Sequence, residues 1–464
     1  MERKTVGKIV TVMAAFLMLA TAAYAEVTNT SGVYFRLRQE TWDNMFDMNK
    51  SDVPTASPYA RQDETFWRLK TSVWDKVDID NRYGLFVKLT NEAKYYQTSN
   101  TAWQVGTVGD EILFDNIYAY IKKPAELPVD LTVGRQDFLG TFGEMFLIAD
   151  GTPLDGSRTF YFNAARALVT VNEKYNVDLA YLYTQEEDHF PLASYYKSNE
   201  LPAGFKSRQL NASDEQAVVV YGRGKITDNV TIEPYYIWKN EDAPLSNLAA
   251  PVLRLNTYGV RAVVGFGEGW KVRAEYALQS GQYNNGTDRT GSGGYAYIGR
   301  TYSNIASQPS WDLGYATLSG DDPTTTNKIE AWDPLFSRYP WMSELYSLTM
   351  LTEAGPGQGI AAYWTNLQVY RAQFKFNLPA DSRLELSYNV LKANENVTGF
   401  GPFAPLFTGT GKDRGTLEAV KLYHKFSPQL DGYVTVEAFQ PGNVYATTNR
   451  DAAQFVRWEL QWKI

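Results

Sequence analysis

The feature that most constrains the fold of this chain is a two-residue alternation of apolar and polar side chains that recurs along almost all of it. The alternation occurs in eighteen stretches of about 10 to 15 residues, bounded by Gly, Pro, Asn and Asp. Strands in soluble sheets are usually about 5 to 6 residues long, whereas a tilted strand needs about 9 to 11 residues to cross a bilayer. The pattern therefore predicts membrane-spanning strands. They are 31–43, 63–77, 80–98, 110–123, 128–138, 161–173, 176–187, 213–226, 228–240, 253–267, 269–283, 293–305, 310–319, 363–378, 381–394, 413–426, 429–440 and 451–464.

The connections between these stretches alternate between short and long. An even number of strands, with short turns at one rim and long loops at the other, is the layout of an outer-membrane barrel. We therefore predict an all-β fold, an 18-stranded antiparallel transmembrane β-barrel with short periplasmic turns and long extracellular loops. No Pro/Ser-rich linker divides residues 26–464, so we expect one domain. The predicted long loops are 44–62, 99–109, 139–160, 188–212, 241–252, 284–292, 320–362, 395–412 and 441–450.

The first 25 residues have the pattern of a cleaved signal peptide. A basic start precedes the apolar run Ile9 to Ala20, and Ala23-Tyr24-Ala25 fits a small-x-small cleavage site. With the barrel, this predicts the outer membrane of a Gram-negative bacterium, where lipid and lipopolysaccharide surround the protein. The chain has no Cys, which excludes disulfides and thiolate sites, and its net charge of −8 without a basic run argues against nucleic-acid binding.

The last predicted strand shows how the two faces are assigned. In FVRWELQWKI, Val456, Trp458 and Leu460 share one face, whereas Arg457 and Glu459 share the other. In a transmembrane barrel the apolar face meets lipid and the polar face meets the lumen. The same alternation elsewhere predicts a polar lumen that carries charges of both signs.

The loop 139–160 combines glycines with charged residues and is a candidate for the inside of the lumen. Two arginines, Arg135 and Arg158, bracket it. Arginine is always charged, and its planar guanidinium suits carboxylate ligands. The loop 320–362 is the other candidate to narrow the lumen or to cap it. The acidic residues of the first loop are Asp137, Glu144, Asp150 and Asp155.

Three motifs carry a resemblance to a known family. GRQ-x-F at 134–138, ADGTPLDGSRTF at 149–160 and LSGDDPTTTNKIEAWDPLFSRYP at 318–340 resemble the alginate export family of outer-membrane porins. The strand count from the alternation agrees with that family's 18-stranded barrel. The resemblance implies export of an anionic uronate polysaccharide through a narrow constriction lined by arginines. Periplasmic secretion components are candidate partners in this export.

The resemblance also implies which arginines form the constriction. By motif these are Arg135 and Arg158, and by strand position Arg68 and Arg36 join them. Independently, an anion-selective pore needs Arg or Lys that face the channel. The alternative for any single one is that it pairs with a neighbouring Asp or Glu and fills the barrel. Further basic candidates on the inward face are Arg371, Arg273, Arg261 and Lys70, together with Arg38, Lys88, Lys375 and Arg383.

Metal and catalytic sites have weaker patterns. The acidic turns DGTPLDG and GDDP could ligate Ca²⁺, but the same residues also cap tight turns, and neither has the spacing of an EF-hand. We therefore predict no cofactor and no metal site. His189 and His424 are the chain's two histidines, and neither has a nucleophile motif beside it. We predict that the protein is not an enzyme.

The sequence favours a passive channel for an anionic polysaccharide or oligosaccharide. Two alternatives remain open. One is a substrate-specific or general porin for small solutes, often trimeric. The other is a structural barrel that houses a periplasmic partner, for example a cytochrome; the chain has no Cys-x-x-Cys-His and so would bind no c-type haem of its own.

Overall fold

The alternating stretches form strands in a computed structural model of the chain. The structure describes residues 26–45, 47–50, 63–99, 106–138, 140–144, 146–149, 162–188, 191–194, 209–337, 341–349, 364–399 and 401–464. The expected signal peptide, residues 1–25, lies outside them. Within the described residues no helix has the length and apolar character needed to span a membrane.

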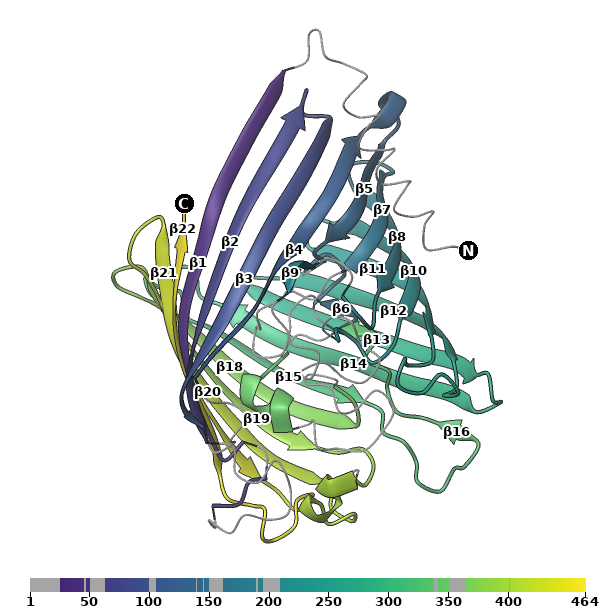
Figure 1. Cartoon of the computed structure of the whole chain (residues 1–464), viewed down its shortest axis with the longest axis vertical. Helices are drawn as coiled ribbons and strands as arrows, with labels where there is room; N and C mark the ends of the chain where they lie inside the picture. The colour runs from purple at the N-terminus through teal and green to yellow at the C-terminus, as the bar shows by residue number, and fades with distance from the viewer. Residues whose placement is uncertain are drawn as a thin grey trace.

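Eighteen antiparallel strands in the described residues pair in sequence order and close into a barrel, which confirms the predicted fold class (Figure 1). The ring closes where the first strand pairs with the last. The barrel strands are β1 (Val27–Asp43), β2 (Glu64–Ile79), β3 (Tyr83–Ser99), β4 (Gly106–Lys122), β5 (Val129–Gln136), β7 (Phe162–Thr170), β8 (Tyr175–Thr184), β10 (Glu215–Thr227), β11 (Val230–Glu241), β12 (Leu253–Phe266), β13 (Trp270–Tyr283), β14 (Asp288–Thr301), β15 (Ser310–Leu318), β18 (Leu367–Leu378), β19 (Ser382–Lys392), β20 (Asp413–Lys425), β21 (Leu430–Pro441) and β22 (Ala453–Lys463).

Smaller elements lie in the connections. β9 (Pro191–Ser194) pairs with β4, and β16 (Lys328–Ile329) pairs with β14. β6 (Ile148–Ala149) and β17 (Phe336–Ser337) form a separate parallel pair. The helical elements in the described residues are α2 (Glu344–Thr349), η1 (Pro124–Glu126) and η3 (Gly401–Leu406).

The two faces of the strands follow the predicted alternation. On β22, Val456 and Trp462 are 37% and 50% exposed on the outside, whereas Arg457 and Glu459 are each 1% exposed on the inside. β13 behaves in the same way, with Leu278 outside and Glu275 inside. The outer face is therefore apolar, as a lipid-facing surface requires.

The start of β14 departs furthest from its predicted position. We expected a long loop at 284–292 and a strand from residue 293, but β14 begins at Asp288 and includes Gly291. A Cβ atom at Gly291 would lie 3.2 Å from the Cα of Trp332, and one at Gly293 would lie 2.9 Å from the Trp332 ring and 3.0 Å from Phe146. These glycines therefore belong to a strand that leaves room for side chains packed inside the barrel.

The interior holds a packed unit built from two loops, which we call the plug: the described residues of 138–149 and 331–347. β6, labelled within the ring of strands in Figure 1, and β17 join its two halves, with Ile148 paired to Phe336. The rings of Phe146 and Trp332 stack with 5.0 Å between their centroids. The two loops therefore support each other although almost 190 residues separate these two rings in the chain.

Inward-facing side chains from many strands hold the plug. Phe142 packs edge-on against Tyr221 of β10, and Phe146 packs against Tyr295 of β14. On the far side, Ser343 donates a hydrogen bond to Glu437 of β21 at 2.6 Å. Buried aromatic rings each remove a large apolar area from water, so this packing is the principal hydrophobic core of the described residues.

Candidate lumenal passage

Two adjoining cavities lie between the plug and the wall formed by β13 to β22. They share Trp341 of the plug and two residues of β18, Arg371 and Gln373. The cavity over β13, β14, β15 and β18 has a volume of about 300 Å³, and the one over β18 to β22 has about 200 Å³. Because they share residues, the two cavities form one candidate passage beside the plug.

The cavity over β13 to β18 has an excess of basic side chains. Lys271 and Arg273 line it from β13, and Arg371 and Lys375 line it from β18. All four share the inward parity of their strands. The opposing carboxylates in the lining are Glu144 of the plug and Asp312 of β15. We call this inward surface of β13, β15 and β18 the open wall.

Two cations of the open wall, Arg371 and Lys271, have no partner among the described residues. Within the described part of the chain, neither Arg371 nor Lys271 forms a hydrogen bond or an ion pair, and the Nε of Arg371 is buried without an acceptor. Lys375 has one carboxylate, Glu385, at 3.7 Å. An arginine without a partner carboxylate leaves its fork of donors available to an anionic ligand.

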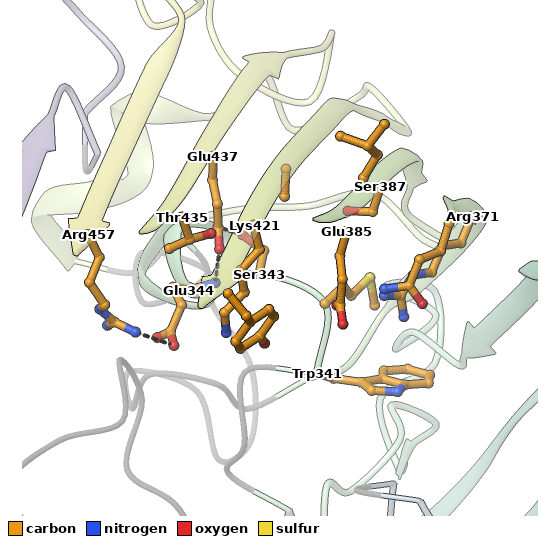
Figure 2. Close-up of a pocket in the computed structure, with 15 residues that line it drawn as sticks. Trp341, Ser343, Glu344, Arg371, Glu385, Ser387, Lys421, Thr435, Glu437 and Arg457 are labelled. Atoms are coloured by element: carbon orange, nitrogen blue, oxygen red, sulfur yellow. Dashed lines mark hydrogen bonds and ion pairs between the residues drawn. The ribbon is translucent and has the colours of Figure 1, made fainter. Parts of the chain in front are cut away.

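The second cavity has balanced charges (Figure 2). Arg371 and Arg457 stand at opposite sides of it, with Glu385 and Lys421 between them. Arg457 binds Glu344 of the plug at 2.7 Å, and the Nζ of Lys421 lies 4.0 Å from the centre of the Tyr433 ring. The passage is therefore most basic where it faces β13 and β18.

Two predicted pore arginines, Arg261 and Arg273, bind the plug. Glu144 accepts hydrogen bonds from Arg261 at 3.2 Å and from Arg273 at 2.6 Å. Arg261 also binds Glu233 at 2.8 Å, and Arg273 pairs with Asp312. These charge-assisted bonds fix the plug to β12 and β13.

Other predicted arginines form a buried network across β22, β1, β2 and β3, which we call the seam wall. Glu40 accepts from Arg38, Arg68 and Arg457 at 3.1 to 3.3 Å. Arg38 lies opposite Glu459, and Glu40 lies opposite Arg457, in the register of the closing strands. Opposite charges in these positions favour one register of closure.

The remaining members of the seam wall are equally enclosed. Glu92 binds Arg36 at 3.1 Å and Arg68 at 2.9 Å. The charged groups of these pairs are almost fully buried. Lys70 is 5% exposed. Arg36 and Arg68 thus pair with neighbouring carboxylates and fill the barrel, which is the alternative considered above for any single lumenal arginine.

The motif arginine Arg135 is also engaged. It is 2% exposed at the end of β5, pairs with Asp188 at 3.0 Å and donates to the carbonyl of Phe114 at 2.9 Å. Asp137 is exposed beside it. Arg158, Asp150 and Asp155 lie outside the described residues, so the constriction role expected of Arg135 and Arg158 stays a prediction.

The acidic turn at 320–323 is used within the chain. The Asp322 carboxylate accepts hydrogen bonds from the Thr324 backbone at 2.9 Å and from its hydroxyl at 2.7 Å. These bonds stabilise the charged form and lower the pKa of Asp322 below its ordinary value. In the described ranges no three acidic or histidine side chains gather in the arrangement of a metal site.

Sequence reasoning missed part of the passage. The alternation along their strands places Lys421 and Lys271 on the inward face. Nothing in the sequence distinguishes them from inward lysines that pair with a carboxylate. Trp341 and Glu344 lie in a long loop, where no periodic pattern reports on orientation. Their places depend on contacts with strands far away in the chain.

Comparison with known proteins adds family and fold. A family model described as "Alginate export" matches residues 49–458. No curated protein matches the sequence. Among solved structures, Pseudomonas aeruginosa OccK8 (OprE) has a TM-score of 0.54 at 10% identity over 94% of this chain and 98% of that chain.

Two further solved structures show the same likeness. Acinetobacter baumannii OccAB4 has a TM-score of 0.54 at 10% identity, and the match covers 94% of this chain and 98% of that chain. Pseudomonas aeruginosa OprD has a TM-score of 0.51 at 11% identity, covering 94% and 95%. At these identities the likeness concerns the fold, an outer-membrane porin barrel.

Proposed function

From the premise that this chain belongs to the Alginate export family, we propose that it passes an anionic polysaccharide or oligosaccharide by diffusion along the open wall. The coarser statement, an outer-membrane channel with a porin-like barrel, follows from the family and the fold. The finer one rests on one observation. Arg371 and Lys271 face the passage without a partner in the described residues.

The chemistry of these cations suits a polymer of carboxylated sugars. A channel needs sites that bind well enough to admit an anion and weakly enough to release it. The open wall provides separate cations on neighbouring strands rather than one enclosed cluster. A chain with a carboxylate on each sugar can move from Lys271 to Arg371 and exchange one weak contact for the next.

The proposal extends to cellular location and excludes catalysis. We propose that residues 1–25 are removed on export and that the barrel resides in the outer membrane of a Gram-negative bacterium. Family and structural relatives support a channel that performs no chemistry. A sheath for a periplasmic protein is the less favoured alternative, because the rings of the plug pack against inward-facing side chains of the barrel.

The test is ion preference and polymer block in a planar bilayer, comparing wild type with Arg371→Gln, Lys271→Gln and the double variant. A unit charge at 4 Å contributes about 1 kcal/mol in water, less with screening by salt, so we expect the double variant to lower the anion-to-cation permeability ratio by roughly fivefold. Block by an oligouronate should weaken in parallel. Lys174→Gln, on the exposed turn before β8, is the matched control.

A result in which the double variant keeps the wild-type ion preference and the wild-type block would contradict the proposal. Flux of neutral sugars and uronate oligomers at equal rates in liposomes would instead favour the small-solute porin. Both measurements use the intact barrel, and removal of cations without partners is not expected to disturb its folding.

A further inference from the structure

A second lumenal surface lies at the opposite side of the barrel, on the short-turn ends of β1, β2, β3 and β22. We call it the basin. It has a volume of about 770 Å³, and its lining contains Lys76, Lys88 and Lys463 together with Trp74 and Phe86. No Asp or Glu side chain is among its lining residues in the described part of the chain. None of the residues assigned to the open wall contributes to it.

Three aromatic rings form a continuous row beside the basin. The rings of Trp74 on β2 and Phe86 on β3 stack with 6.0 Å between centroids and 28° between planes. Phe86 stacks on Tyr118 of β4 at 5.2 Å and 27°. All three share the inward parity of their strands: Trp74 that of Ser72, Phe86 that of Thr90, and Tyr118 that of Tyr120.

The row is not part of the packed core. Trp74, Phe86 and Tyr118 are all partly exposed, whereas the core ring of Phe146 is 4% exposed. Aromatic rings that fill a barrel are covered by other side chains, so partly exposed rings in a lumen offer their faces to whatever passes. Gly32 makes room for Trp74, since a Cβ there would lie 2.6 Å from the indole ring.

In the ion pairs beside the row, the lysine side chain is the partner exposed to the basin. The side chain of Lys76 is 39% exposed while that of its partner Asp78, at 2.6 Å, is 14% exposed. For Lys88 and Asp115, at 2.7 Å, the values are 21% and 0%. In both pairs the carboxylate is the more buried member. At Lys76 and Lys88 the basin therefore presents the ammonium group and conceals the anion that balances it, whereas Lys463 pairs at 3.1 Å with Asp431, whose side chain is exposed.

We propose that the basin is a capture site for an anionic saccharide on the periplasmic side, and this proposal rests on the function proposed above. The C–H face of a pyranose ring is apolar and packs on an aromatic ring, while carboxylates on the same polymer meet the lysines. Neutral apolar solutes lack the second contact, and small inorganic anions lack the first. A site with aromatic rings beside cations therefore selects a ligand that carries both sugar rings and carboxylates.

The location gives the site a role in transport. Short turns mark the periplasmic rim of an outer-membrane barrel, and Trp74 lies on β2 five positions before the strand ends at Ile79. A saccharide arriving from the periplasm meets the basin before it reaches the plug. The aromatic row then holds sugar rings at the mouth and raises the local concentration of polymer for the open wall.

The experiment measures block of single channels by an oligouronate added to one side at a time. Orientation is read from Glu173→Cys on an exposed periplasmic turn, because the chain has no other cysteine and an impermeant thiol reagent then labels one side. For wild type we expect longer block from the periplasmic side. Trp74→Ala and Phe86→Ala should each shorten that block about tenfold.

Matched variants separate the aromatic contact from general damage. Trp74→Phe keeps a ring and should retain most of the block. Phe374→Ala removes a phenyl ring from the lipid-facing side of β18 and should leave it unchanged. Lys76→Gln should weaken block by the oligouronate but not the weaker block by a neutral glucan oligomer of equal length.

The outcomes distinguish this proposal from the previous one. The open-wall variants could lose their ion preference while Trp74→Ala and Phe86→Ala keep the wild-type block from the periplasmic side. This result would refute the capture of saccharide in the basin and leave the proposed function standing. Shortened block in the two aromatic variants, with conductance and ion preference in potassium chloride as in wild type, supports the basin. Equal block by the oligouronate and the neutral glucan would overturn the assignment of an anionic ligand.

Discussion

The seam wall and the open wall use the same residue types in opposite ways. On the seam wall, arginines and glutamates of β22, β1, β2 and β3 are matched, and their side chains are at most 3% exposed in the pairs of Arg36, Arg38 and Arg68. On the open wall, Arg371 and Lys271 have no partner in the described residues. An inward arginine therefore signals a channel only when no carboxylate neutralises it.

The difference has a thermodynamic reason. Burying a charge is costly unless it is paired, so arginines enclosed beneath other side chains need carboxylates within ion-pair distance. A cation beside a solvated cavity keeps part of its hydration and can remain unpaired. The seam wall contributes to the closure of the barrel, and the open wall is left for a solute.

The largest effect should follow from breaking the seam wall. Glu40→Gln leaves Arg38, Arg68 and Arg457 without their shared carboxylate, because an amide accepts hydrogen bonds but carries no charge. Removing one partner from a buried network costs about 3 to 5 kcal/mol. Unfolding in urea, or the temperature of the gel-mobility shift in detergent, measures this. Unchanged stability would mean that the network is neutral to folding.

A smaller effect is expected where the open wall meets the plug. Arg273→Gln removes the ion pairs with Glu144 and Asp312, and hydrogen bonds to charged groups contribute about 1.5 to 3 kcal/mol each. We expect this substitution to weaken the attachment of the plug to the barrel wall. Open-channel noise and conductance should therefore rise while the barrel remains folded. Lys375→Gln, which does not contact the plug in the described residues, is the control. Equal noise in both variants would argue against this anchoring role.

The smallest effect is expected from a glutamate on the edge of the passage. Glu385 lies 3.7 Å from Lys375 and 2.9 Å from Arg383, and both cations are more than 40% exposed. Glu385→Gln should change stability by no more than about 1 kcal/mol, because exposed ion pairs contribute little. Anion preference should rise slightly, since two cations lose their counter-charge. A stability loss as large as that of Glu40→Gln would erase the distinction between the two walls.

The fold was largely predictable from sequence because its cause is local. A strand places successive side chains on opposite faces. In a barrel with lipid outside and a polar lumen inside, each strand therefore appears in the sequence as a stretch of alternating apolar and polar residues, which gives both the number of strands and the face of each side chain. The closing strand illustrates this, with Val456 outside and Arg457 inside as its alternation indicates. At Gly291 of β14, which packs against the plug but was predicted to lie in a loop, the predicted boundary was wrong.

The sequence by itself thus determined the barrel and the inward set of charges, whereas the tertiary structure decided which of those charges remain available. Parity gives Arg68 and Arg371 the same status, yet Glu92 lies beside one and a cavity beside the other. The fold of the long loops was equally unreadable, because Glu144 meets Arg273, which follows it by 129 residues. Parity is set by neighbours in the chain, but neutralisation is set by neighbours in space.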